Sequence, residues 1–159
     1  MTEMMMNPFT KFDKEWALVT SGTKEKFNSM TISWGSVGTL WFKSIVTIYI
    51  RPDRYTFEFL KENDTFTLSF FGEENREALQ IMGSRSGRNV DKVEAAGLTP
   101  EFLKDGITYK EAKQTIICRK LYMQKMNLDA VPEEARRYYE TDADMHHMII
   151  GEVIKVENP

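Results

Sequence analysis

The sequence of 159 residues lacks the features that mark several common classes of protein. Its single cysteine, Cys118, cannot form a disulfide within the chain, so we expect a reducing, cytoplasmic location. No window approaches the roughly 20 apolar residues that a membrane-spanning helix needs. The first residues, MTEMMMNPF, also lack the apolar core of a signal peptide. We therefore expect no membrane partner.

Motifs for several kinds of chemistry are missing as well. Neither a triphosphate-binding loop nor a glycine-rich dinucleotide fingerprint occurs, and a net charge of -3 gives no support for nucleic-acid binding. The only histidines, His146 and His147, are adjacent, so on a strand they would point to opposite faces and could not share one ion. No zinc-ligand spacing surrounds Cys118, and nothing marks a serine or cysteine nucleophile. We predict neither a metal site nor a nucleic-acid partner.

What is present predicts one mainly β domain over residues 1–159. Apolar and β-branched runs predict strands at 15–21, 30–34, 44–51, 65–71 and 148–156, with a long bent strand within 109–126. The run at 65–71 alternates, as half-buried strands do. Helices are expected at 54–62, 73–82 and 89–96, a short helix or ordered loop at 131–139, and a loop at 99–106. Without an alternating strand–helix rhythm, an antiparallel barrel with helical insertions is the simplest closure.

The stretch at residues 28–41, NSMTISWGSVGTLW, combines small residues with two tryptophans just before an apolar strand. Small residues let a backbone approach a flat ligand with exposed N–H groups, and Trp34 and Trp41 supply flat surfaces. We interpret the stretch as a loop that holds one edge of a flavin. The alternative is an ordinary connection between strands, with a tryptophan in the core.

Two basic clusters suggest anion binding. In RPDRYT, Arg51, Arg54 and Thr56 surround the start of the helix for which Asp53 is the predicted N-cap, where unpaired N–H groups favour a phosphate. The alternative is a capped helix with solvated arginines, and the Asp53 carboxylate would compete with an anion. The second cluster, in GSRSGRNVDK, offers either another contact to a phosphate or flavin edge or a solvated loop; it contains Arg85, Arg88 and Lys92.

The segments NSMTISWG, RPDRYTFEFLKEN, TFTLSFF, SGRNVDK and HHMIIGEV, in this order, resemble those of the flavin reductase-like, FMN-binding split-barrel proteins, in particular the flavoredoxin-like branch. The similarity extends over residues 16–156. It implies a six-stranded antiparallel split barrel that forms a homodimer, with one FMN per subunit near the dimer interface.

The resemblance also implies which residues bind FMN. Those expected along the isoalloxazine ring and ribityl chain are Asn28, Met30, Thr31, Ser33 and Trp34, with backbone N–H groups from Thr31 to Gly35 facing the ring. Those expected at the phosphate are Arg51, Arg54, Tyr55 and Thr56, and those in a covering loop are Ser86, Gly87 and Lys92. His146 matches a position near the reacting face of the flavin, although Met145 precedes it where relatives often have an acidic residue.

The implied function is an FMN-binding oxidoreductase. Hydride would pass from NADH or NADPH to the flavin, and electrons would continue to free flavin or a small acceptor, with no residue acting as a covalent catalyst. One alternative is an electron-transfer or flavin-storage protein that does not itself oxidise the nicotinamide. Another is a barrel that has lost its flavin, against which the combination of Arg54, Thr56 and Lys92 argues.

Overall fold

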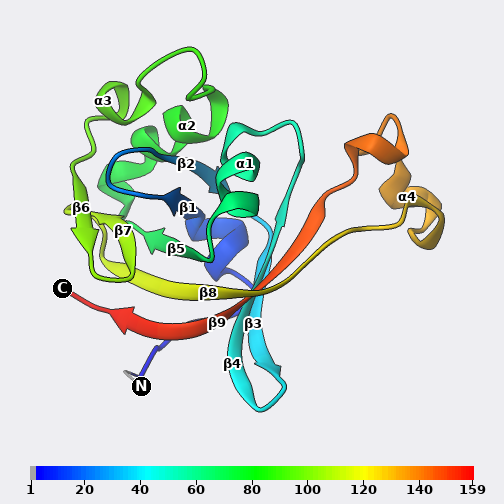
Figure 1. Cartoon of the computed structure of the whole chain (residues 1–159), viewed down its shortest axis with the longest axis horizontal. Helices are drawn as coiled ribbons and strands as arrows, with labels where there is room; N and C mark the ends of the chain where they lie inside the picture. The colour runs from blue at the N-terminus through cyan, green and yellow to red at the C-terminus, as the bar shows by residue number, and fades with distance from the viewer. Residues whose placement is uncertain (1–2) are drawn as a thin grey trace.

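The structure, a computed structural model, describes residues 3–159. Seven strands of this part of the chain form one antiparallel sheet, in the order β2-β1-β5-β8-β9-β4-β3 (Figure 1). They are β1 (Ala17–Gly22), β2 (Phe27–Ile32), β3 (Gly35–Leu40), β4 (Lys43–Ile50), β5 (Thr65–Phe70), β8 (Gln114–Lys125) and β9 (His147–Glu157). A separate hairpin pairs β6 (Pro100–Leu103) with β7 (Gly106–Tyr109).

Short helices occupy the connections. They are η1 (Lys11–Glu15), α1 (Tyr55–Glu62), η2 (Glu73–Asn75), α2 (Arg76–Ser84), α3 (Lys92–Ala96), η3 (Leu128–Ala130), α4 (Glu133–Arg136) and η4 (Asp142–Asp144). The mainly β antiparallel fold with helical insertions is confirmed. The predicted helices correspond to α1, to η2 with α2, to α3 and to α4.

Three details of the prediction are wrong. The sheet has a seventh strand because residues 35–40, expected as loop, form β3 and pair with β4. Part of the loop expected at 99–106 is β6, which pairs with β7. Asp53 does not cap α1: the N-cap is Arg54, without a side-chain cap bond.

Strand β5 is also more buried than its alternating pattern predicts. Phe66, Leu68 and Phe70 enter the core, but Thr67 and Ser69 on the opposite face are fully buried too. The β6–β7 hairpin covers that face, where Thr67 donates a hydrogen bond to the Ile107 carbonyl and Ser69 lies 3.0 Å from the Thr108 hydroxyl. Because these buried hydroxyl groups have hydrogen-bond partners, they can lie in the interior at little energetic cost.

Two apolar clusters hold the domain together. The larger fills the curled sheet with side chains such as Val19, Ile48, Phe66 and Ile149. The smaller, which includes Leu18, Leu79, Met82 and Tyr109, fills the space under α2, α3 and β7. Strand β1 contributes to both, since Val19 points into one cluster and Leu18 into the other.

The path from β2 to β3 determines the shape of the sheet. These strands are its two outer strands, yet only Ser33 and Trp34 separate them in sequence. Because the three steps from Ile32 to Gly35 span only about 10 Å, the sheet must curl until its edges meet at this crossing. The curl gives the barrel-like body of Figure 1.

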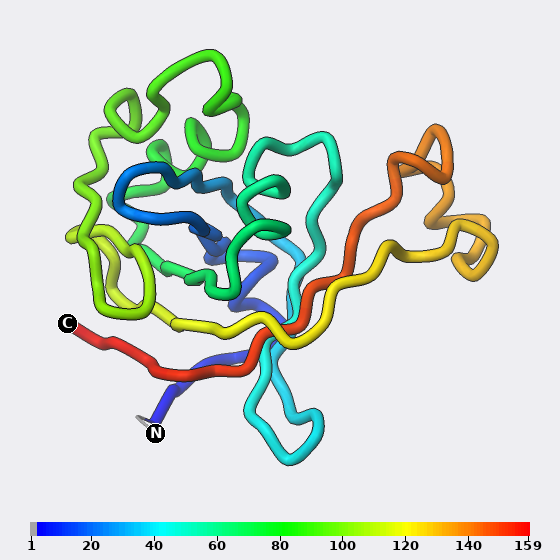
Figure 2. Tube along the Cα trace, viewed as in Figure 1, coloured from blue at the N-terminus to red at the C-terminus, as the bar shows by residue number. Residues whose placement is uncertain are grey.

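Strands β8 and β9 extend beyond this body. Residues 115–119 of β8 pair with both β5 and β9, whereas the later residues pair with β9 alone. The register with β9 shifts between Ile117 and Cys118 and again between Lys120 and Tyr122. This confirms the predicted long strand shared between two parts of the sheet. The far ends of both strands carry residues 126–146, here called the arm, which stands to one side of the body (Figure 2).

The turn between β3 and β4 is unusual. Trp41 and Phe42 have φ angles of 51° and 59°, and they are 60% and 110% exposed. Bulky side chains rarely adopt this left-handed backbone. Trp41, expected to supply a flat surface in the flavin-binding loop, instead lies at this hairpin tip between β3 and β4.

Within residues 3–159, no helix has the length and apolar character needed to cross a membrane.

Packing around Gly151 yields a stability prediction. A Cβ atom there would lie 2.6 Å from Phe66 Cζ and 2.9 Å from Cys118 Cβ, whereas one at Gly38 would meet nothing within 4 Å. We expect Gly151→Ala to lower the free energy of unfolding by about 1–3 kcal/mol because it overpacks the core. Gly38→Ala, the control, should change it by less than about 1 kcal/mol. Urea denaturation of both variants tests this, and equal midpoints would contradict it.

Candidate functional site

Two adjoining cavities lie where the chain crosses from β2 to β3. The first, which we call the basic cavity, has a volume of about 280 Å³ and is lined by Asn28, Met30, Asp53, Arg54, Tyr55, Thr56, Gly83, Ser84, Arg85, Ser86, Gly87 and Lys92. The second, the aromatic cavity, has a volume of about 210 Å³ and is lined by Met30, Thr31, Ile32, Ser33, Trp34, Tyr49, Arg51, Arg54 and His146. Met30 and Arg54 line both.

All the residues predicted for the site except Gly35 line these two cavities. Gly35 begins β3 and packs against Phe12, where a Cβ atom would lie 2.7 Å from the ring. The expected loop of N–H groups from Thr31 to Gly35 is also wrong in extent. Thr31 belongs to β2 and pairs with Leu18, so the connection itself consists of Ser33 and Trp34.

Two cations lie side by side in the basic cavity. Lys92 Nζ donates hydrogen bonds to the carbonyl oxygens of Met82 at 3.0 Å and Arg85 at 3.2 Å, at the end of α2. Arg54 Nη2 donates to the carbonyl oxygen of Gly83 at 3.0 Å. Within residues 3–159 neither side chain forms an ion pair.

Burial disfavours the charged forms of both groups. Lys92 is only 3% exposed, and its pKa falls to about 8 because of burial first and of repulsion by Arg54 second. Burial also lowers the pKa of Arg54, partly opposed by the Asp53 carboxylate. Lys92 is a buried positive charge and Arg54 a half-buried one, and neither has a paired anion within residues 3–159. Because such charges are costly without a partner, the cavity is electrostatically suited to bind an anion. The interpretation of Lys92 as part of a solvated loop is therefore wrong.

Small and polar residues shape the floor of the basic cavity. Asn28 Nδ2 donates to Thr56 Oγ1 at 2.7 Å, and both side chains are buried. A Cβ atom on Gly87 would lie 2.1 Å from Asn28 Oδ1, so this close approach requires glycine. Thr56 stands in the first turn of α1. There the Phe57 N–H donates to the Arg54 carbonyl at 3.0 Å, whereas the N–H groups of Tyr55 and Thr56 have no partner within residues 3–159.

The aromatic cavity has a flat, half-exposed wall. Trp34 is 47% exposed, so it is not the core plug of the alternative interpretation. Its ring lies 5.4 Å from that of His146 and 5.8 Å from that of Tyr138. Arg51 joins this cavity to the arm: its Nη2 donates to the Tyr138 carbonyl at 2.6 Å, and its guanidinium lies 5.2 Å from the Tyr139 ring. Arg51 therefore belongs to this wall and lies outside the basic cavity.

His146 is buried and neutral. Burial lowers its pKa to about 4, and the positive charge of Arg51 lowers it further than the Asp53 carboxylate raises it. His147 turns away and packs against Phe57, with the ring centroids 4.5 Å apart. The two adjacent histidines thus face different parts of the structure, as predicted.

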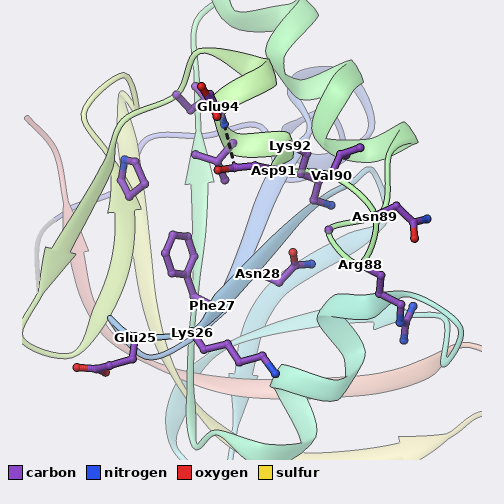
Figure 3. Close-up of a pocket in the computed structure, with 14 residues that line it drawn as sticks. Glu25, Lys26, Phe27, Asn28, Arg88, Asn89, Val90, Asp91, Lys92 and Glu94 are labelled. Carbon is purple, nitrogen blue, oxygen red and sulfur yellow. Dashed lines mark hydrogen bonds between the residues drawn. The ribbon is translucent and has the colours of Figure 1, made fainter.

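A larger groove of about 810 Å³ opens beside the basic cavity and shares Asn28, Gly87 and Lys92 with it (Figure 3). Two of its charged groups, Asp91 and Arg88, have partners in the protein. Asp91 accepts a hydrogen bond from the Glu94 backbone N–H at the start of α3, drawn as a dashed line in Figure 3. Arg88 binds Glu58 Oε1 at 2.7 Å and lines the groove, outside the basic cavity.

Sequence reasoning missed the aromatic residues that reach the site from the arm. Tyr138 and Tyr139 contact Trp34, Arg51 and His146, which come from distant parts of the chain. The one local signal is the pair of tyrosines in RRYYE, seven residues before His146.

The chain belongs to the flavin reductase like domain family, which matches residues 9–159. A comparison with curated proteins finds no match. The fold is that of solved split-barrel flavin reductases, as predicted.

Solved structures that resemble this one include several flavoproteins. The flavoredoxin from Methanosarcina acetivorans has a TM-score of 0.73 and 18% identity, over 99% of this chain and 76% of that one. The FMN-binding protein from Thermus thermophilus has a TM-score of 0.72 and 20% identity, over 99% and 80%. The NADH:FAD oxidoreductase from Streptomyces globisporus has a TM-score of 0.70 and 16% identity, over 91% and 75%.

Proposed function

We propose that this protein binds FMN across the two cavities and is an oxidoreductase that uses NADH or NADPH. The phosphate would lie in the basic cavity, and the isoalloxazine ring would lie along Met30 and Ser33 to the aromatic cavity. Electrons would pass to free flavin or to a small acceptor. A cytoplasmic location is part of this proposal.

The observation that carries the proposal is the pair of cations in the basic cavity, Lys92 buried and Arg54 half-buried. Arg54 and Lys92 donate only to carbonyl oxygens within residues 3–159, so both have charge available for an anion. A phosphate would also meet the Thr56 hydroxyl and the N–H groups of Tyr55 and Thr56 at the start of α1. Charge-assisted hydrogen bonds of this kind are the strong ones. The residues present therefore fit a phosphate-bearing cofactor.

The aromatic cavity fits the other end of the same molecule. Trp34 offers a flat exposed surface and His146 a polar edge, next to the outer strand of the sheet. A bound flavin accepts hydride itself, so the protein needs no nucleophile and supplies position and electrostatics. Trp34, His146 and Met30 would orient the ring and leave one face open to a nicotinamide.

The similarity to a NADH:FAD oxidoreductase supports the reductase proposal. The similarity to two flavoredoxins supports a second candidate, an FMN protein that transfers electrons or stores flavin without oxidising the nicotinamide itself.

We also propose a homodimer. The exposed aromatic cavity wall and the exposed Trp41–Phe42 turn leave apolar surface that a second copy would cover.

The phosphate assignment predicts that Arg54→Ala weakens FMN binding about 10-fold or more, because a hydrogen bond to a charged group contributes about 1.5–3 kcal/mol. Thr56→Val should likewise weaken it about 10-fold, because the hydroxyl's hydrogen bond to the charged phosphate is lost. Quenching of flavin fluorescence measures the affinity. Arg119→Ala, which removes an exposed arginine paired with Glu152, is the control and should bind FMN like the parent. Unchanged affinity in both site variants would reject the phosphate assignment.

The oxidoreductase proposal is tested by the visible spectrum of the FMN-loaded protein before and after anaerobic addition of NADH or NADPH. We expect rapid bleaching of the yellow flavin band by at least one of them. Stable yellow colour with both donors would support the electron-transfer alternative. Failure of the purified protein to bind added FMN would reject both.

For the dimer, we expect light scattering at micromolar protein to give twice the monomer mass of 18.5 kDa. Replacing Trp41 and Phe42 by Asn and Gly, which favour this turn, should weaken the dimer without unfolding the hairpin. A monomeric mass for the parent protein would reject the proposal.

A further inference from the structure

Tyr139 on the arm is bonded to His146 at the edge of the aromatic cavity. The tyrosine hydroxyl lies 2.7 Å from Nδ1 of the imidazole, and the two rings are 5.5 Å apart at 84°. His146 is only 8% exposed. Tyr139 therefore forms a hydrogen bond with one of the two ring nitrogens of His146, the histidine that lines the cavity.

The ring is held on its other side by Trp34, at 5.4 Å and 52°. Since Tyr139 takes Nδ1, the nitrogen left for a ligand is Nε2. Within residues 3–159 no protein group forms a hydrogen bond with it. The imidazole is therefore fixed in orientation with one nitrogen free.

The hydrogen bond between Tyr139 and His146 has a preferred direction. A phenol is the stronger acid of the two, and the unprotonated nitrogen of a neutral imidazole is the stronger acceptor. The Arg51 guanidinium over the Tyr139 ring adds to this preference because it withdraws electron density from the phenol. Its charge also disfavours the imidazolium, in which Nδ1 would have to donate. The hydroxyl thus donates to Nδ1, and the imidazole proton lies on Nε2.

We propose that Tyr139 is a positioning residue that holds His146 as the Nε2–H tautomer, so that the imidazole donates one hydrogen bond to a carbonyl oxygen of a ligand in the aromatic cavity. The ligand half of this inference rests on the proposed function. The carbonyl is then either that of the flavin ring or that of the nicotinamide carboxamide. The tautomer half concerns this chain alone.

The tautomer is read from protein labelled with ¹⁵N-histidine, without ligand, by long-range ¹H–¹⁵N spectroscopy at neutral pH. The chain has two histidines, so His147 serves as an internal reference. We expect His146 to be protonated at Nε2 and unprotonated at Nδ1. In Tyr139→Phe the two nitrogen shifts should move toward each other as the second tautomer becomes populated, with His147 unchanged. Protonation of Nδ1 in the parent protein, or unchanged shifts in the variant, would overturn the proposal.

Tyr138→Phe is the matched control. The Tyr138 hydroxyl accepts a hydrogen bond from Arg137 at 3.0 Å, and the phenylalanine ring would keep the packing against Trp34. This variant should leave the shifts of His146 as they are in the parent. A change as large as that in Tyr139→Phe would mean that the arm acts only through general packing, which would also overturn the proposal.

The ligand half is tested by adding FMN, and then NAD⁺ or NADP⁺, to the labelled protein. A shift of the His146 Nε2–H signal with FMN assigns the carbonyl to the flavin, and a shift only after the nicotinamide assigns it to the carboxamide. If FMN binds and neither addition moves the signal, the ligand half is wrong. If FMN does not bind, the proposed function fails, while the ligand-free spectra still decide the tautomer.

A double-mutant cycle distinguishes a positioning role of Tyr139, which acts through His146, from a purely structural role. Tyr139→Phe should weaken binding of the probe that moves the signal about fivefold, as expected for one hydrogen bond. In His146→Gln, the glutamine amide places an N–H donor near the position of Nε2–H, and this donor does not depend on a tautomer. Tyr139→Phe should therefore have no further effect on binding in a His146→Gln background. An equal loss in both backgrounds would show a purely structural role and reject the proposal.

Discussion

The site depends on the short crossing from β2 to β3. Two residues, Ser33 and Trp34, carry the chain between the outer strands of the sheet, so the sheet has to curl until those strands meet. The crossing brings Met30 and Trp34 against the arginines that follow β4, and the two cavities form at that junction. Fold and site therefore share one geometrical cause.

The electrostatics of the basic cavity follow from a second constraint. The loop after α2 brings Lys92 back beneath the end of that helix. There, carbonyl oxygens without helical partners accept hydrogen bonds from its ammonium group. This arrangement stabilises a buried ammonium without using a carboxylate, which would cancel its charge. Arg54 does the same at Gly83. Lys92 and Arg54 donate to neutral carbonyl oxygens, which do not cancel their positive charges. Both charges therefore remain available to bind an anion.

Much of this could be predicted from the sequence, and the misses have physical reasons. The strongly apolar strands and helix α3, which ends at Gly97, follow from local patterns, and most candidate residues come from segments whose order matches a family. Strand β3 could not be foreseen because GSVGTL has two glycines and little β propensity, and only pairing with β4 makes it a strand. The buried hydroxyls of β5 look solvent-facing until the β6–β7 hairpin covers them. The contact between Tyr139 and His146 depends on the tertiary path of the arm, and no periodic pattern in the sequence indicates it.

The arm is attached to the body only through the ends of β8 and β9, and most of its side chains are exposed. Substitutions of its exposed residues therefore remove little buried apolar surface and should leave the stability of the barrel nearly unchanged. Yet its tyrosines touch the tryptophan, arginine and histidine of one cavity. The aromatic cavity can thus vary by mutation of a segment that folding scarcely constrains, while the basic cavity lies within the body. Mutation and selection can therefore change the aromatic cavity independently of the basic cavity.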